Sequence, residues 1–504
     1  MLALALATLA FARIPGPIQE LSRIELKRRL GELETELRAE RPETRRSAVR
    51  ELARMHQGAA WSLVIGALAD EDSAVGDAAQ RALGELGDPD LARELLGRAG
   101  LDSREPRVAL RVAEALGRLP QELDGEQIAR RFDAGDEELT RLLLWSIERL
   151  SRDGRLGGRK QDVSAAVLAL HHSRRAPELA ARALLTLAAL DQPNLVELVQ
   201  DAAREQHCAL RSAALVVARE GGVGELADLP LRLASDPDPR VRALAIAALA
   251  ARPTRAGLLV LVGRLENEPR LGLRVRLVEA LQAATGLKHR LDPRPWRQVI
   301  ERFPQDWQPP SSPAAADSPR AGESAAKSPL RIPIQSDRIA FLFDFSGSMW
   351  TALPDGRTPK EIVAARLREA LQTLTDETHF NLVPYSYDPL PWRPALCAAD
   401  TAKVREALGF FEGCSARGKG NVYDAARLAL ADPEVDRIVI LTDGVPTGGT
   451  FSDLDLVVEL LCEHGLLRGV AFDAVLVDAP HACVARWQRL ARATGGRVME
   501  VGLE

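Results

Sequence analysis

Two aspartates and two serines in the last third of the chain have the types and spacing of a divalent-cation site. Asp344, Ser346 and Ser348 stand at the end of one apolar run, and Asp443 stands at the end of another. Two carboxylates held close together repel each other unless a cation lies between them. Carboxylate and hydroxyl oxygens are hard ligands that suit Mg²⁺, Mn²⁺ or Ca²⁺. These four residues therefore predict a site for a divalent cation.

A parallel sheet is needed to bring the two apolar runs together. The runs at 338–345 and 437–444 have the continuous apolar pattern of strands that are buried on both faces. Further strands are predicted at 379–386 and 471–478, with amphipathic helices between them. This alternation indicates a mostly parallel sheet with helices on both faces, in which ligands bind at the carboxyl ends of the strands. We expect the two runs to be neighbouring strands, so that all four residues meet at one edge.

The first three hundred residues have a different, repeating pattern. Apolar segments with helical spacing recur roughly every 30 residues, and turns such as DEDSAV and DPDPRV precede several of them. Asp and Pro in such turns end one helix and cap the next. One helix pair of this size cannot bury its apolar face alone, so neighbouring pairs must stack into a solenoid. The pattern predicts an all-α array over residues 18–305, whose simplest role is that of a scaffold.

Two segments belong to neither pattern. Residues 306–336 are rich in Pro, Ser and Ala and have few large apolar residues, which predicts a partly extended linker. Residues 1–12 are apolar and end in Ala-Phe-Ala, like a signal peptide, but they lack its basic start. Either they direct export to the periplasm or the extracellular space, or they begin a partly buried first helix of a cytoplasmic protein.

Composition narrows the classes of partner. The formal net charge of -5 argues against nucleic acid, because phosphate binding needs a concentrated positive field. No apolar run reaches the roughly 18 residues that a membrane span requires.

Cys462 and His464 resemble half of a zinc site, with His481 and Cys483 as the other half. The predicted strand 471–478 separates the two halves by more than one metal ion can bridge.

The motifs DFSGSM (344–349) and LTDGVPT (441–447) together resemble the von Willebrand factor type A domain and its metal-ion-dependent adhesion site. This resemblance covers residues 337–504. The helical pattern over about 40–290 resembles short HEAT repeats. Together they imply a multidomain chain, with an all-α HEAT-like solenoid followed by an α/β, Rossmann-like von Willebrand type A domain.

The family motif assigns a role to each candidate residue. By position, Ser346 and Ser348 bind the metal ion through their hydroxyls, and Asp344 and Asp443 act directly or through water. The resemblance thus implies Mg²⁺, or Mn²⁺ or Ca²⁺ in its place, as the cofactor.

One position departs from the family motif. A threonine normally precedes Asn-hydrophobic-Tyr-Asp, and in GKGNVYDA (418–425) that position is Gly420. Water, Ser415 or Asn421 fills the vacant ligand position, or Lys419 competes with the metal ion there. Alternatively, the site has degenerated and the domain keeps its fold without binding metal.

The resemblance implies a non-enzymatic protein that acts in protein–protein interaction, adhesion or scaffolding. An Asp or Glu of a protein partner would complete the coordination of the bound ion. The sequence does not identify that partner. A second interpretation is an assembly factor that binds partners without metal. A third is a hydrolase with Asp344 as nucleophile, but a serine, Ser346, stands where such a site has its second aspartate.

Overall fold

The computed structural model describes residues 23–55, 58–133, 135–173, 176–221, 224–309 and 335–501. The chain divides into two compact units, one up to Val167 and one from Leu168. The predicted signal segment at 1–12 lies outside the described residues, and so does most of the predicted linker at 306–336. Export and the linker therefore stay predictions.

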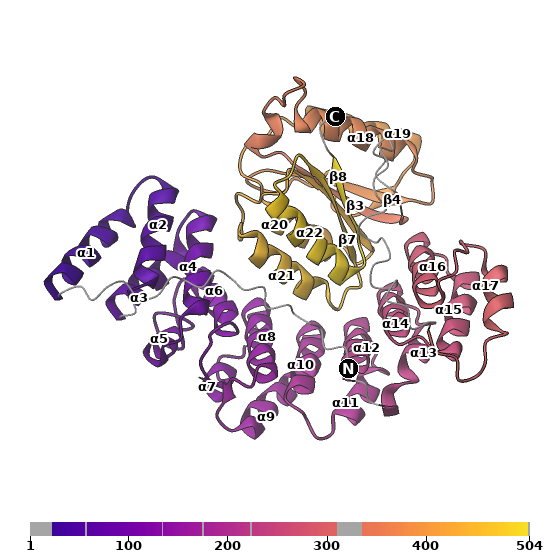
Figure 1. Cartoon of the computed structure of the whole chain (residues 1–504), viewed down its shortest axis with the longest axis horizontal. Helices are drawn as coiled ribbons and strands as arrows, with labels where there is room; N and C mark the ends of the chain where they lie inside the picture. Colours follow the sequence, from indigo (N-terminus) through magenta and orange to yellow (C-terminus); the bar gives the residue numbers. More distant parts are fainter. Residues whose placement is uncertain are drawn as a thin grey trace. The chain divides into compact units, whose positions relative to one another are not determined.

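The first unit is built from helices, whose labels appear in Figure 1. They are α1 (Arg23–Glu36), α2 (Pro42–Ala53), α3 (Gly58–Gly66), α4 (Ser73–Glu85), α5 (Pro89–Leu95), α6 (Pro106–Leu116), α7 (Gly125–Ala129), α8 (Glu137–Arg152) and α9 (Lys160–His171), the last of which continues into the second unit. Two short strands, β1 (Leu123–Asp124) and β2 (Leu156–Gly157), pair in parallel. Helices α2, α4, α6 and α8 pack in succession and form one layer of a solenoid.

The second unit begins with a helical array of its own. Its helices are α10 (Pro177–Ala189), α11 (Leu195–Ala202), α12 (Cys208–Gly221), α13 (Leu229–Leu233), α14 (Pro239–Ala251), α15 (Arg255–Asn267), α16 (Leu271–Thr285) and α17 (Pro293–Ile300). Here α10, α12, α14 and α16 form the successive layer, and α11, α13 and α15 pack beside them. In the described residues, no helix is both long enough and apolar enough to cross a membrane.

A recurring arginine contact joins consecutive repeats. Arg45, Arg211 and Arg242 each donate two hydrogen bonds to a carboxylate 25 or 26 residues later in the chain. In each case Nη1 also donates to two carbonyl oxygens five and six residues earlier. The carboxylates are those of Asp70, Asp236 and Glu268 respectively. We call each contact an arginine link, because it fixes the turn before its own helix to the turn before the corresponding helix of the next repeat.

An α/β domain completes the second unit. Its strands are β3 (Arg338–Asp344), β4 (His379–Tyr385), β5 (Cys397–Ala398), β6 (Arg437–Thr442), β7 (Ala471–Val477) and β8 (Val498–Val501). Its helices are α18 (Pro359–Gln372), α19 (Thr401–Gly413), α20 (Val422–Ala431), α21 (Leu454–Gly465) and α22 (His481–Thr494). The sheet order is β5-β4-β3-β6-β7-β8, with only β5 antiparallel to its neighbour. The predicted fold class is confirmed, and β6 does lie beside β3.

Helices cover both faces of this sheet, as Figure 1 shows. Phe341 and Phe343 of β3 belong to a buried cluster with Leu367 of α18 and Phe411 of α19. The rings of Phe343 and Phe411 pack edge to face, with centroids 4.8 Å apart. Helix α20 packs against β3 and β4, and α22 packs against β7 and β8. Such burial contributes roughly 1.5–3 kcal/mol for each large apolar side chain, so the sheet is a rigid support for its two edges.

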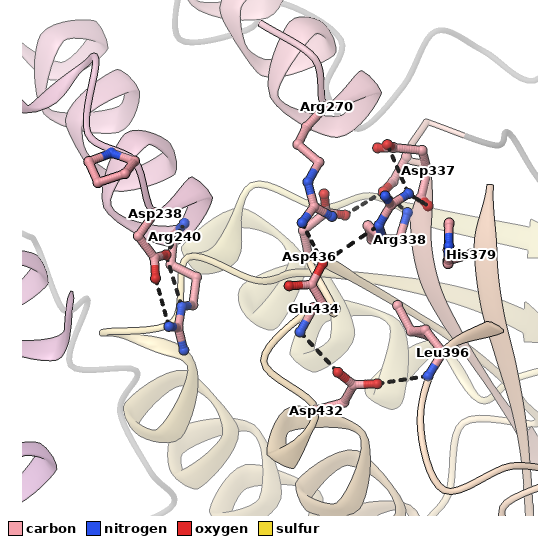
Figure 2. Close-up of polar contacts among 12 residues, drawn as sticks. Asp238, Arg240, Arg270, Asp337, Arg338, His379, Leu396, Asp432, Glu434 and Asp436 are labelled. Carbon is pink, nitrogen blue, oxygen red and sulfur yellow. Dashed lines mark hydrogen bonds and ion pairs between the residues drawn. The ribbon is translucent and has the colours of Figure 1, made fainter. Parts of the chain in front are cut away.

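The amino ends of the strands contact the array within the second unit. Arg270 forms an ion pair with Glu434, which precedes β6, although the two are 164 residues apart. The backbone N–H of Leu271 donates to Oδ1 of Asp337 at 3.0 Å. Figure 2 shows Arg270, Asp337 and Glu434 in the same region as Asp436. The amino ends of the strands are thus occupied by contacts within the chain. A binding site is therefore expected at their carboxyl ends.

Asp436 makes the stability of this contact dependent on pH. Burial raises its pKa to about 6, against the opposing effects of Ser336 and Arg276. The folded chain therefore binds more protons than the unfolded chain between about pH 4 and 6, and the stabilisation from the neutral acid is lost as the pH rises through that range.

We expect the free energy of unfolding of Asp436→Asn to rise relative to wild type by up to about 3 kcal/mol between pH 4 and 7. Urea unfolding of both proteins across that range would measure the difference. A difference that does not change with pH would show that Asp436 ionises normally.

Candidate divalent-cation site

Asp344 is the last residue of β3 and lies at the carboxyl edge of the sheet, only 2% exposed. Its Oδ1 accepts a hydrogen bond from the backbone N–H of Ser346 at 2.8 Å, which turns the chain out of the strand. The short helix Gly347–Trp350 follows and carries Ser348. The Ser346 and Ser348 hydroxyl oxygens are 3.1 Å apart. The structure thus brings together the three oxygen-bearing side chains of the first predicted motif.

The loop that precedes α20 closes one side of this group. Residue Ser346 forms a parallel bridge with Gly418, and the N–H of Gly347 donates to the Gly418 carbonyl at 3.0 Å. A Cβ placed on Gly420 would lie 3.4 Å from both carboxylate oxygens of Asp344. Gly420 therefore faces the site, and a side chain at that position would enter it. The N–H of Gly420 donates to the hydroxyl of Thr447 at 2.6 Å.

Asp443 reaches the site from the neighbouring strand. It follows Thr442, the last residue of β6, and is half-buried. The hydroxyl of Thr442 donates to Oδ2 of Asp344 at 2.7 Å and accepts from the N–H of Gly444 at 3.0 Å. Gly444 has a φ of 95°, a conformation that favours glycine, and its carbonyl accepts from the indole of Trp487 at 3.0 Å. These contacts fix the turn that presents Asp443.

The two carboxylates influence each other. Burial and, to a smaller extent, the charge of Asp443 raise the pKa of Asp344 to about 6, although hydrogen bonds from Ser346 and Thr442 oppose the rise. None of these main influences is a positive charge. An ionised carboxylate buried in this way is unfavourable without a cation close to it.

The residues present fit a hard divalent cation. Asp344 and Asp443 supply carboxylate oxygens, and Ser346 and Ser348 supply hydroxyl oxygens, which are the ligands that Mg²⁺ and Mn²⁺ prefer. A cation here would relieve the repulsion between the carboxylates. Its remaining positions would be open to water or to a carboxylate from another protein, which is chemistry suited to recognition.

Asn421, proposed to replace the family threonine, and Lys419, proposed to compete with the metal ion, both have other contacts. Oδ1 of Asn421 accepts from the N–H of Asp424 at 3.2 Å and caps α20, while Nδ2 donates to the carbonyl of Tyr387 at 2.8 Å. A Cβ placed on Gly448 would meet the side chain of Lys419, which therefore lies along that loop. Ser415 is exposed.

Sequence reasoning missed two groups around Asp344. Thr442 was not proposed as a hydrogen-bond donor, although it directly precedes the predicted ligand Asp443. Tyr385 ends β4 in register with Asp344 and was also missed. The signal for both was available, because residues at the carboxyl ends of adjacent parallel strands meet at one edge.

Comparison with known families finds one match within the helical array and one over the α/β domain. The profile for HEAT repeats matches residues 32–117, and the profile for the von Willebrand factor type A domain matches residues 337–499. Both resemblances inferred from the sequence are confirmed.

The relatives share only a limited segment with this chain. Inter-alpha-trypsin inhibitor heavy chain H4 of Bos taurus is 31% identical over 130 residues, which is 23% of this chain and 14% of the relative. Human inter-alpha-trypsin inhibitor heavy chain H2 is 31% identical over 123 residues, 22% of this chain and 12% of the relative. A solved structure of von Willebrand factor type A from Catenulispora acidiphila is 20% identical, covers 32% of this chain and 38% of its own, and has a TM-score of 0.27.

Proposed function

Because the chain carries HEAT repeats and a von Willebrand factor type A domain, we propose that it is a non-enzymatic protein-recognition molecule. Its α/β domain binds an acidic residue of a protein partner through a divalent cation, Mg²⁺ or Mn²⁺ by preference. The observation that carries this proposal is the group of oxygen ligands around Asp344, a buried carboxylate whose pKa is raised by burial and by the nearby Asp443. The helical array serves as the scaffold for the domain.

Exposed apolar side chains at the same edge support recognition of a protein. Tyr387 is 60% exposed, Leu390 is 52% exposed and Val445 is 39% exposed. Tyr387 and Leu390 follow β4, and Val445 follows β6, so all three lie in loops at the carboxyl ends of strands. Large apolar side chains left in water next to a polar site are typical of a surface that a protein partner covers.

Positive charges near Ser348 support an acidic partner. Trp350 is on the same short helix as Ser348, and two cations lie over its ring. The Nζ of Lys360 is 4.2 Å from the ring centroid, and the guanidinium carbon of Arg417 is 4.3 Å from it. Stacking on an aromatic ring holds these groups in place without neutralising them. They would attract an acidic surface toward the cation site.

The glycine at position 420 supports a second candidate function. It supplies no hydroxyl at the position that faces Asp344, and a domain that has lost a ligand can retain its fold and its surface. In that case the chain is an assembly factor that binds partners through the exposed apolar edge without metal.

Capture experiments separate the two candidates. The immobilised full chain would be exposed to extract from its source cells in MgCl₂ or in EDTA, with immobilised Asp344→Asn as the matched control. We expect partner capture only in MgCl₂ and only by the wild type. Equal capture by the wild type in MgCl₂, by the wild type in EDTA and by Asp344→Asn would favour the metal-independent function.

Restoring the family residue should tighten cation binding. In Gly420→Thr a fixed hydroxyl replaces a water ligand, so we expect calorimetric titration of the full chain with Mn²⁺ to show a dissociation constant roughly three to ten times lower. The Cβ position makes only ordinary contacts, so the change fits the space. Gly420→Ala is the matched control, because it adds the Cβ without the hydroxyl. Equal gains in both variants would assign the effect to backbone rigidity.

A further inference from the structure

Tyr385 carries a buried polar atom that has no partner in the described part of the chain. Its side chain is 1% exposed, and its hydroxyl makes no hydrogen bond there. A buried hydroxyl without a hydrogen bond costs about 1–3 kcal/mol. Phenylalanine would fill the same volume without that penalty. The fold alone therefore gives no reason for the oxygen atom, and a function at this position would give one.

The position of Tyr385 points to the cation site. It ends β4 directly beside Asp344 at the end of β3, in register, so the two residues share one edge and one face of the sheet. A phenol is ordinarily protonated at neutral pH, so Tyr385 offers a hydrogen-bond donor at this end of the sheet.

The side chains of Thr442 and Asp344 at this edge form hydrogen bonds with groups other than Tyr385. The hydroxyl of Thr442 donates a hydrogen bond to Asp344 and accepts one from the N–H of Gly444. Oδ1 of Asp344 accepts from Ser346, and Oδ2 accepts from Thr442. None of these hydrogen bonds includes the hydroxyl of Tyr385, so the metal-free edge is held together without it.

Gly420 leaves space for an acceptor on the same site. Its missing side chain opens a position 3.4 Å from the carboxylate oxygens of Asp344. A water that replaces the threonine hydroxyl would need hydrogen-bond partners of its own to be held in a fixed place. Tyr385 is a donor of the right kind beside the same carboxylate.

We propose that Tyr385 is a positioning residue of the divalent-cation site, whose hydroxyl gains its hydrogen-bond acceptor only when the cation and its accompanying waters are bound. This inference rests on the proposed function of that site. It gives the chain a substitute for the lost threonine, in which a water held by Tyr385 takes the place of a protein ligand.

The test is Tyr385→Phe in the full chain, with two measurements. Calorimetric titration with Mn²⁺ should show affinity reduced about tenfold, since one hydrogen bond in the bound state is lost. Urea unfolding in EDTA should show the metal-free variant to be as stable as the wild type or more stable, because an unpaired buried hydroxyl has been removed. Removal of a hydroxyl with only a structural role would instead lower the stability of the metal-free chain and leave the Mn²⁺ affinity unchanged.

Tyr423→Phe is the matched control. The hydroxyl of Tyr423 is in the same domain and is paired with Nε2 of His464 at 3.0 Å. Its removal should destabilise the metal-free chain and leave Mn²⁺ affinity unchanged.

Unchanged Mn²⁺ affinity in Tyr385→Phe would overturn the inference, and so would a loss of metal-free stability like that of Tyr423→Phe. A wild type that binds no Mn²⁺ would instead overturn the proposed function on which the inference rests.

Discussion

Asp344→Asn should reduce the affinity of the full chain for Mn²⁺ at least about a hundredfold, the largest effect expected of any change at the site. Asparagine keeps the size of the side chain and removes the charge that balances the cation. The same change should stabilise the metal-free chain above pH 6, by up to about 3 kcal/mol, because the buried ionised carboxylate is unfavourable there. A variant that is more stable without metal but binds Mn²⁺ more weakly would show that the carboxylate serves to bind the cation and does not stabilise the fold.

Calorimetry with Mn²⁺ and urea unfolding in EDTA measure the two effects. Asp400→Asn is a suitable control, because Asp400 is a partly exposed residue of the same domain that caps α19, and asparagine also caps helices well. Its Mn²⁺ affinity should equal that of the wild type. Equal Mn²⁺ affinity in wild type and Asp344→Asn would remove the cation from this site altogether.

Arg437→Met should lower the free energy of unfolding by about 3–5 kcal/mol. Arg437 begins β6 and forms an ion pair with Asp473 of β7 at 2.6 Å, with both side chains 2% exposed. Removal of the arginine leaves a buried carboxylate without its counter-charge. Asp473 also accepts from the N–H of Arg497 at 2.8 Å, so the pair holds three strands in register at the amino edge.

The double change Arg437→Met with Asp473→Asn tests the cause. Asparagine can still accept from Arg497 but carries no charge, so the double variant should be more stable than Arg437→Met alone. Urea unfolding followed by tryptophan fluorescence would compare the three proteins. A double variant that is less stable than the single variant would show that lost packing, not an unpaired charge, dominates.

Much of the α/β domain was predictable because burial on both faces requires long apolar runs. Those runs located β3 and β6, and the rule that ligands bind at carboxyl ends placed Asp344 and Asp443 at one edge. The absence of a hydroxyl at Gly420 was also visible in the sequence. Its contact with Thr447 was not, because the path of an irregular loop has no periodic signal.

The contacts at the amino edge could not be predicted. Arg270 and Glu434 are far apart in the sequence, and the chain has 66 basic and 71 acidic residues that could form such a pair. Only the packing of α16 against the ends of the strands selects this one. Charge pairing becomes specific through tertiary structure, whereas apolar periodicity is a local property that the sequence displays directly.

The arginine links have a consequence for how the array can change in evolution. Each link joins a donor in one repeat to an acceptor in the next, at a separation of 25 or 26 residues. A tandem gene duplication of one whole repeat copies a donor and an acceptor together, so the new junctions are complementary from the start. An insertion inside a repeat breaks that spacing at once. Gain or loss of a whole repeat therefore preserves the arginine links, whereas a change in the length of one repeat does not.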